Sequence, residues 1–358
     1  MRRIENIISC VKCRNDIRYR ENSFHCTVCT HTYSVVNGIP RFVPQDYWAF
    51  NKDNSDLAKK TKNYFGFQWD YFKDLGFIPD DKVPPDEAEK YHGGLISHRV
   101  KAFDAKCRLS ESDLGREKVV LDAGCGNGRY TYEAAVRGES LVIGVDIGYG
   151  AVESAYENNK SNNNVVIIQA DLFNLPFKDE VFDACFSNGV LMHTGDATKA
   201  FSEIGRTIKE KGVFVVNVYH RLNPIWEFND RVLRKFTTEL SIENILRFSK
   251  AMSSLSRVIN RVPYGFQLAN LFLRIQPTMH HMFDWYSAPV ATHHTYDEVA
   301  EWFREHGFAL PEKIPQFGFW SRPWAVNLKG VKVRSIHDRS AGYITERGDG
   351  KNLESPDI

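Results

Sequence analysis

The sequence has no long hydrophobic run and almost no net charge. None of its apolar stretches approaches the ~20 residues that a helix needs to cross a bilayer, and Met1 to Glu5 contain no hydrophobic signal core. The 46 lysines and arginines nearly balance 45 acidic residues, which gives a formal net charge of +1. These absences argue against a membrane protein and against one that holds a long polyanion through its overall field. We therefore expect a cytoplasmic protein that does not bind membranes.

Cysteine is also scarce, and its distribution is uneven. Four of the seven cysteines form two Cys-x-x-Cys pairs separated by twelve residues near the N-terminus: Cys10, Cys13, Cys26 and Cys29. This spacing is typical of two knuckles that hold one structural Zn²⁺ through four thiolates. A pair of disulfides is the weaker alternative, because nothing in the sequence indicates a secreted protein. The other three cysteines form no comparable pattern, and we expect them to be reduced and packed.

Glycine is concentrated in one informative turn. The apolar run Val119 to Leu121 continues into Asp-Ala-Gly-Cys-Gly-Asn-Gly, and a helical stretch follows from Arg129. Glycines at alternate positions let main-chain N–H groups approach a ligand closely, and they permit backbone angles that strain other residues. A strand, a glycine-rich turn and a helix form the ligand-binding unit of doubly wound α/β folds. The turn alone does not distinguish a nucleotide-like cofactor from NAD, FAD or a simple tight turn.

Further apolar runs follow at regular intervals. The run at 141–145 ends in Asp146, which is placed to accept hydrogen bonds from both hydroxyls of a ribose. The run at 165–170 ends at Asp171, and those at 181–186 and 212–219 complete the series. Strands that alternate with helical stretches predict a mostly parallel, doubly wound sheet with helices on both faces.

Four ordered motifs carry a resemblance to a known family. The segments VLDAGCGNGRY, GVDIG, QADLFNLPF and FDACFSNGVLMHT resemble, in order and spacing, the class I S-adenosylmethionine-dependent methyltransferases, and the similarity covers roughly residues 95 to 330. The resemblance implies a Rossmann-like fold and an S-adenosylmethionine cofactor. The cofactor-binding residues that it implies are Asp122, Gly124, Cys125, Gly126, Asp146, Ile147, Asp171, Leu172 and Asn188.

The resemblance also assigns parts of the cofactor to these residues. It implies that the glycine turn cradles the methionine part. It also implies that Asp146 binds the ribose, that Asp171 binds the adenine and that Asn188 lies beside the sulfonium. From the residues alone other roles stay open: Asp122 suits a helix cap, and Asp146 or Asp171 suits a turn at a strand end. NAD is disfavoured because the turn lacks the glycine spacing of the dinucleotide fingerprint.

The N-terminal segment has a second resemblance. The residues from His31 to Phe42 are similar to the end of zinc-ribbon domains like the small activator subunit of eukaryotic methyltransferases, with Ser34 where that pattern usually has proline. Seven cations in this segment outnumber three acids, which suits phosphate binding or a merely solvated surface. The cations are Arg2, Arg3, Lys12, Arg14, Arg18, Arg20 and Arg41.

These features predict a division of the chain. We expect a zinc ribbon over 1–44, an aromatic linker with a cofactor-covering helix over 45–94, a methyltransferase domain over 95–330 and a mobile tail over 331–358. In the linker, Gln68 and Trp69 are candidates for contact with substrate or cofactor, and Trp69 is equally suited to dock the ribbon. An insert at 222–290 should form a helical cap, because it is too long for a structureless loop. Its periodic apolar residues are expected to be core, and they are Val232, Phe236, Leu240, Ile245, Phe248, Met252, Leu255 and Ile259.

His193, at the end of the fourth motif, is the candidate catalytic base. An imidazole pKa near roughly 6.5 suits removal of a proton from a hydroxyl acceptor, although a packing or capping histidine is equally compatible with this position. We expect methyl transfer to an O or N atom of a small metabolite, a sugar or a natural-product intermediate. An RNA methyltransferase that holds RNA through the ribbon is the alternative, and a non-catalytic scaffold is a third, weaker one. The sequence does not specify the acceptor or the oligomeric state.

Overall fold

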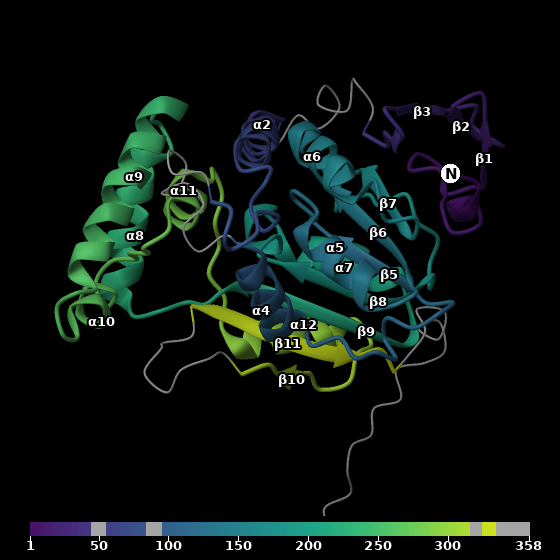
Figure 1. Ribbon diagram of the computed structural model, residues 1–358. Coiled ribbons are helices and arrows are strands. Elements are labelled where there is room, and N and C mark those ends of the chain that lie inside the picture. Colours follow the sequence, from purple (N-terminus) through teal and green to yellow (C-terminus); the bar gives the residue numbers. More distant parts are fainter. Residues whose placement is uncertain (44–54, 84–94, 316–323, 334–358) are drawn as a thin grey trace, which may run out of the picture.

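A seven-stranded sheet forms the centre of this computed structural model, which describes residues 1–43, 55–83, 95–315 and 324–333 (Figure 1). The strand order is β10-β11-β9-β8-β5-β6-β7. The strands are β5 (Val119–Ala123), β6 (Leu141–Asp146), β7 (Val165–Gln169), β8 (Phe182–Asn188), β9 (Ile208–Tyr219), β10 (Glu312–Lys313) and β11 (Ala325–Val331). Only β11 runs against the others, since β10 pairs antiparallel with β11 and is therefore parallel to β9. This confirms the predicted mostly parallel, doubly wound sheet.

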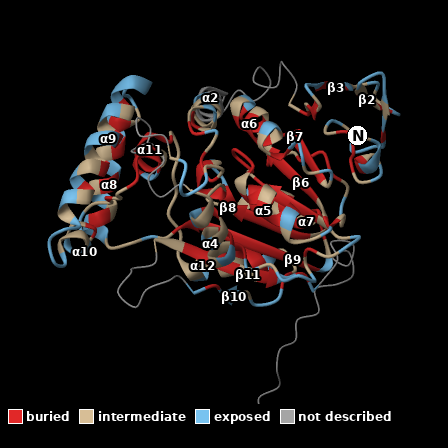
Figure 2. Cartoon of the chain, viewed as in Figure 1, coloured by how far each residue is buried: buried red, intermediate tan, exposed pale blue. Residues whose placement is uncertain are grey.

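Helices cover both faces of the sheet. Alternate strand residues contribute to two apolar clusters, as Val120 and Leu121 do on β5, and this is why the strands are apolar throughout. One face is covered by α4 (Ile96–Cys107), α5 (Arg129–Arg137) and α6 (Tyr149–Asn159), and the other by α7 (Ala197–Arg206) and α12 (Tyr296–Glu305). Figure 2 shows the resulting burial, with the strands almost wholly red.

The strand order reverses between β5 and β8, because β6 and β7 follow β5 to one side while β8 and β9 lie on the other. Such a reversal leaves a crevice beyond the carboxyl ends of the strands, where ligands of open α/β sheets bind. Here the glycine turn after β5, Asp146 at the end of β6 and Asn188 at the end of β8 meet at that edge.

The N-terminal module, residues 1–43, docks on the edge strand β7. Its small antiparallel sheet contains β1 (Ile17–Arg20), β2 (Ser23–Cys26), β3 (Thr32–Val36) and β4 (Ile39–Pro40), after a 3-10 turn η1 (Arg2–Ile4). The Phe42 N–H donates to the Gln169 carbonyl at 2.8 Å, and the Ser9 N–H donates to the Pro176 carbonyl at 2.9 Å. The Gln169 carbonyl at the end of β7 is thus paired within the chain, and β4 covers part of a strand edge that would otherwise be prone to aggregation.

A helical cap, residues 224–287, lies beyond the carboxyl end of β9. It contains α8 (Pro224–Thr237), α9 (Ile242–Ile259), α10 (Gly265–Ala269) and α11 (Met279–Ser287). Both α8 and α9 pack against α11, so the surfaces that they turn away from α11 form the outside of the cap (Figure 1). Among the helices described, none combines the length and apolarity that a bilayer crossing requires.

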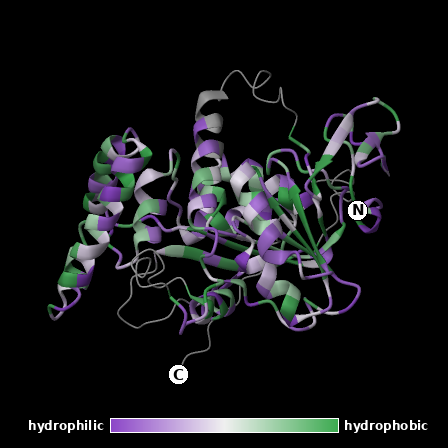
Figure 3. Cartoon of the chain, turned by 45° about the horizontal axis from the view of Figure 1, so that its top comes forward, coloured by the Kyte–Doolittle hydropathy of each residue, from purple (hydrophilic) through white to green (hydrophobic). Residues whose placement is uncertain are grey.

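The expectation that the periodic apolar residues of the cap are core is wrong for four of them. Val232, Phe236, Leu240 and Leu255 are 41–67% exposed, and only Ile245 of the predicted set is fully buried. In Figure 3, which colours the chain by hydropathy, green hydrophobic positions occur along the cap helices. For Val232 and Phe236 the physical reason is that hydrogen-bonded polar residues occupy the inner face of α8. Asp230 accepts from the Trp285 indole at 2.6 Å, and the Thr237 hydroxyl donates to the Tyr286 carbonyl at 2.6 Å.

The predicted mobile tail lies almost entirely outside the described residues, which end at Val333. Much of the predicted linker, 44–54 and 84–94, is also outside them. Between these two segments the chain forms α2 (Ser55–Tyr71).

Candidate active site

The glycine turn has the geometry that its composition predicts. Gly124, Gly126 and Gly128 have φ of 91°, 55° and 77°, a left-handed region that strains side-chain-bearing residues. The N–H groups of Gly124 and Cys125 both donate to the Val145 carbonyl, at 2.8 and 2.9 Å, and this ties the turn to β6. A Cβ atom on Gly124 would lie 2.4 Å from Val190, so this position has no room for a side chain.

Asp146 joins the glycine turn to the start of α6. Its carboxylate accepts the Gly126 N–H at 3.0 Å and the Gly148 N–H at 2.8 Å. Burial raises the pKa of Asp146, and these backbone hydrogen bonds work against that rise. A carboxylate held in this way is oriented at the mouth of the crevice, where it suits a ribose diol.

Asp122 has a different environment on the same sheet. It is 1% exposed and accepts a hydrogen bond from the Thr131 hydroxyl at 2.7 Å, which ties β5 to α5. Burial raises the pKa of Asp122 to about 7. Its contact is thus to a side chain inside the first turn of α5, while Gly128 occupies the N-cap position of that helix.

The remaining predicted cofactor residues lie along the same edge. Asp171 accepts the Phe173 N–H at 2.8 Å, and Leu172 is buried. The Ile147 carbonyl accepts the Gln169 side-chain amide at 3.0 Å. Cys125 is 6% exposed within the glycine turn. The structure therefore brings the predicted residues to one edge, although Asp171 has the local hydrogen bond of an ordinary turn.

Asn188 differs from these residues because its side chain has no partner. Neither the amide nitrogen nor the amide oxygen, both buried, makes a hydrogen bond in the described structure. Such a group is costly unless a ligand completes it. Asn188 ends β8, beside the glycine turn that ends β5.

The helix α2 lies over this edge. A Cβ atom on Gly126 would lie 2.6 Å from the Trp69 indole, so Trp69 covers the glycine turn. The Ser154 hydroxyl of α6 donates to the Trp69 carbonyl at 3.1 Å. The close approach of α2 to α6 depends on Gly150, where a Cβ atom would be 2.3 Å from the Gly66 carbonyl oxygen.

His193 lies in the 3-10 turn η2 (Leu191–His193) that follows β8. Its Nδ1 is 2.6 Å from the Val290 carbonyl oxygen, so Nδ1 must carry the proton and Nε2 the lone pair. That Nε2 atom is buried without a partner in the described structure, and burial lowers the pKa of His193. A neutral imidazole with an oriented, unused lone pair is suited to accept a proton.

A buried polar cluster, formed by Gln68, Tyr219, His280 and Asp284, surrounds this histidine. The Asp284 carboxylate accepts the Gln68 amide at 2.9 Å and the Tyr219 hydroxyl at 3.1 Å, and the Tyr219 ring is 5.3 Å from the His193 ring. Burial lowers the pKa of His280 to about 3, so this ring is neutral. The cluster joins α2, β9 and α11.

Asp284 is a site residue that was not predicted from the sequence. A local signal was available, because His280 and Asp284 are four residues apart and therefore share one face of a helix. That spacing does not show which face is turned toward the sheet edge. The contact to Gln68, 216 residues earlier, follows only from the fold.

The four N-terminal cysteines converge. Their Sγ atoms all lie within 4.8 Å of one another, with Cys10 3.5 Å from Cys29 and Cys13 3.4 Å from Cys26. These separations approach the roughly 3.8 Å edge of a tetrahedron with about 2.3 Å Zn–S bonds. The Val28 and Cys29 N–H groups both point at the Cys26 sulfur at 3.4 Å, which would stabilise a thiolate. The donor set fits a closed zinc site.

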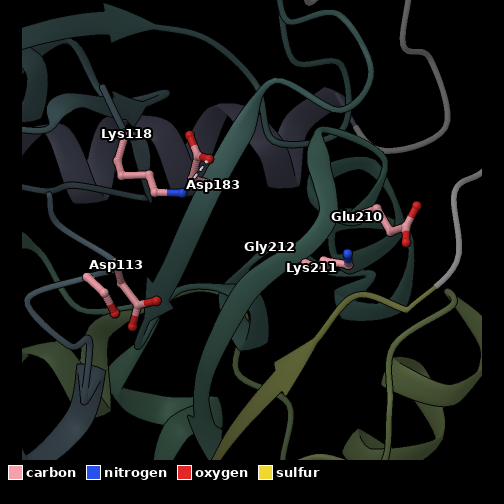
Figure 4. Close-up of a pocket in the computed structure, with 7 residues that line it drawn as sticks. Asp113, Lys118, Asp183, Glu210, Lys211 and Gly212 are labelled. Carbon is pink, nitrogen blue, oxygen red and sulfur yellow. Dashed lines mark hydrogen bonds and ion pairs between the residues drawn. The ribbon is translucent and has the colours of Figure 1, made fainter. Parts of the chain in front are cut away.

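A surface pocket at the opposite ends of the strands is a poor candidate for the cofactor site (Figure 4). Its lining includes Lys118, Asp183, Glu210 and Gly212. Lys118 precedes β5 and pairs with Asp183 at 3.2 Å near the start of β8, so the pocket lies at the amino ends of the parallel strands. Ligands of this fold bind at the other end.

The central region of the chain is similar to known methyltransferases. Residues 114–274 match the family model described as a methyltransferase domain. The chain is 32% identical over 104 residues to tRNA (carboxymethyluridine(34)-5-O)-methyltransferase of Arabidopsis thaliana, covering 28% of this chain and 24% of that protein. It is 28% identical over 179 residues to 2-phytyl-1,4-naphtoquinone methyltransferase of Nostoc punctiforme, covering 48% of this chain and 75% of that protein.

These matches cover only part of most relatives, and the solved structures have low sequence identity. The chain spans only a quarter to about half the length of several curated relatives that it matches. Magnesium protoporphyrin IX methyltransferase from Synechocystis PCC 6803 is 16% identical, with a TM-score of 0.44 over 77% of this chain and 99% of that one.

Proposed function

Because the chain contains a class I methyltransferase domain, we propose that it transfers a methyl group from S-adenosylmethionine to an O or N atom of a small metabolite, a sugar or a natural-product intermediate. One observation carries this proposal most strongly. The glycine turn, the Asp146 carboxylate and the unpartnered Asn188 amide meet at a single sheet edge, beneath Trp69.

These residues fit the proposed cofactor. The glycine turn offers main-chain contact to its methionine part, Asp146 accepts from ribose hydroxyls, and Asn188 supplies an unused donor and acceptor nearby. When bound, the cofactor would supply a methyl group on a sulfonium, which leaves as a neutral thioether. The protein's contribution is to align the acceptor and exclude water, to which the indole of Trp69 over the turn is suited.

His193 is the proposed base. The proton of a hydroxyl acceptor would move to Nε2, while the Val290 carbonyl holds the Nδ1–H and so keeps the ring in one tautomer. General-base catalysis of this kind contributes roughly 10²–10⁴ to rate. The lowered pKa keeps the imidazole neutral and ready at neutral pH.

The N-terminal module is proposed to bind one structural Zn²⁺ through Cys10, Cys13, Cys26 and Cys29. Such a site stabilises a module too small to fold on its own core. A role in holding RNA is less well supported, although a tRNA methyltransferase is among the relatives. Arg3, Arg14 and Arg41 donate to groups of the α/β body, so these cations serve docking within the chain.

The experiment that tests the proposed function uses methyl-labelled S-adenosylmethionine with cell extract, with and without ribonuclease. We expect label in the small-molecule fraction, unchanged by ribonuclease and absent with an Asp146→Ala variant. Label that precipitates with nucleic acid and disappears after ribonuclease would support the RNA alternative. No incorporation into any fraction would contradict methyl transfer altogether.

A further inference from the structure

Two buried hydrogen-bond acceptors, one on the candidate base and one on a neighbouring element, have no donor among the described residues. One is His193 Nε2 and the other is Gln68 Oε1, and neither has a partner in the part of the chain that the structure describes. Their residues are 4% and 0% exposed. Buried acceptors without donors are costly in a native protein, and a ligand that completes them recovers that cost.

The chemical identity of both atoms is fixed by their neighbours. The Gln68 side chain must turn its NH₂ group to the Asp284 carboxylate at 2.9 Å, so its carbonyl oxygen is the unused atom. The His193 Nδ1 must donate to the Val290 carbonyl, so Nε2 presents a lone pair. Asp284, which accepts from Gln68 and interacts electrostatically with His193, is an acceptor as well.

The two acceptors belong to one cluster although they come from different elements. Phe65 of α2 lies 5.1 Å from the His193 ring, one helical turn before Gln68. Tyr219 contacts both His193 and Asp284, the hydrogen-bond partner of Gln68. Its ring is 5.3 Å from the His193 ring, and its hydroxyl is 3.1 Å from the Asp284 carboxylate. Gln68 and His193 are thus linked through Phe65, Tyr219 and Asp284, and each contributes an unused acceptor to this buried cluster.

We propose that the methyl acceptor presents two hydrogen-bond donors to this region, as an amine does or a hydroxyl beside a second hydroxyl, and that it is not a carboxylate. The inference rests on the proposed function. One donor is the reacting group and faces His193 Nε2, and the other is held by Gln68 Oε1. A carboxylate acceptor has no proton to donate and would face the lone pairs of both atoms and the charge of Asp284.

The reaction balances for a hydroxyl acceptor. An oxygen lone pair forms the new C–O bond, the S–C bond breaks with its electron pair remaining on sulfur, and the hydroxyl proton passes to His193 Nε2. Gln68 is a binding residue in this scheme and takes no proton.

The linkage of the methyl group in the product tests the inference on the unaltered protein. After transfer of labelled methyl from S-adenosylmethionine to the small-molecule fraction, mild alkali releases methanol from methyl esters and leaves methyl ethers and N-methyl groups intact. We expect the label to stay non-volatile. Release as methanol would overturn the inference and leave the proposed methyl transfer standing, whereas no transfer to any extract would overturn both.

A variant pair tests the part assigned to Gln68. We expect Gln68→Leu to raise the KM for the labelled acceptor by about tenfold or more, because a buried donor loses its partner, while affinity for S-adenosylhomocysteine stays the same. Gln267→Leu, which changes an exposed glutamine of the cap, is the matched control and should alter neither value. An unchanged acceptor KM in Gln68→Leu, with cofactor affinity and thermal unfolding intact, would overturn the assignment.

Discussion

Individual residues at the sheet edge divide into those defined by local sequence and those defined by the fold. The glycine turn and Asp146 could be predicted, because their roles depend on backbone angles and on the end of an adjacent strand. Gln68 and Asp284 meet across 216 positions, and no local pattern encodes that contact. Trp69 remained ambiguous in sequence, since a tryptophan before the domain suits either docking surface, and the structure sets it over Gly126.

The buried carboxyl group of Asp122 predicts a pH-dependent stability. Its pKa is about 7 in the folded protein against 3.8 for the free side chain, so the folded state binds more protons between these values. Proton binding by Asp122 therefore stabilises the folded state fully below pH 3.8, and this contribution is lost as pH rises through 7. Asp122→Asn should therefore gain stability relative to the parent chain as pH rises from 5 to 8, by at most about 3 kcal/mol. Urea unfolding at both pH values measures this, and parallel pH profiles for the two proteins would contradict the raised pKa.

His193→Ala should lower turnover roughly 10²- to 10⁴-fold and leave affinity for S-adenosylhomocysteine unchanged. Because burial lowers the pKa of His193, the neutral base form persists below the usual imidazole range. Activity should accordingly fall only as pH drops through that lowered value, and the acid limb of the rate profile should vanish in the variant. Full activity in His193→Ala would make this residue a packing histidine.

At the scale of elements, the cap shows what periodicity can and cannot predict. An apolar stripe at helical spacing correctly indicates a helix with one apolar face, but it does not say which side is turned inward. In α8 the inner positions are Trp226, Asp230, Arg234 and Thr237. Hydrogen bonds of Asp230 and Thr237 with α11, and of Arg234 with Ala288 just after it, fix the orientation. The outer positions are left with Phe228 and Phe236, which are 65% and 67% exposed.

Two substitutions in α8 test that orientation. Trp226→Ala should destabilise the protein by about 3–5 kcal/mol, because it empties a fully buried site. Phe228→Ser should change stability by no more than about 0.5 kcal/mol. Chemical unfolding of both variants provides the comparison. A large, concentration-dependent loss in Phe228→Ser would instead mean that association covers the outer face of the cap.

At the scale of the whole molecule, the N-terminal module is part of the same core as the α/β body. Ile8, Phe24 and Phe42 belong to one apolar cluster with Leu175 and Phe177, next to the edge strand that the module covers. Sequence spacing predicted the cysteine cluster, since four thiols at this spacing suit one ion. It did not predict the docking on the α/β body, which includes backbone hydrogen bonds from Phe42 to Gln169 of β7 and from Ser9 to Pro176.

Loss of the proposed metal should therefore affect the entire chain. Replacing Cys10 and Cys13 with serine should release about one zinc per chain and lower the melting temperature of the α/β body together with that of the module. Metal analysis with calorimetry measures both effects. Cys107→Ser, which alters a buried cysteine outside the cluster, should retain the metal. Two separate transitions, with the larger one unchanged, would show that the module does not support the body.

We propose that the adenosyl cofactor lies along the carboxyl ends of β5, β6, β7 and β8. Hydrogen–deuterium exchange with and without S-adenosylhomocysteine is the decisive measurement. We expect slower exchange at 122–128, 146–148, 171–172 and 188–190 when the compound is present, with no protection in an Asp146→Ala variant. Protection confined to other segments, or the same protection produced by NADH instead, would contradict it.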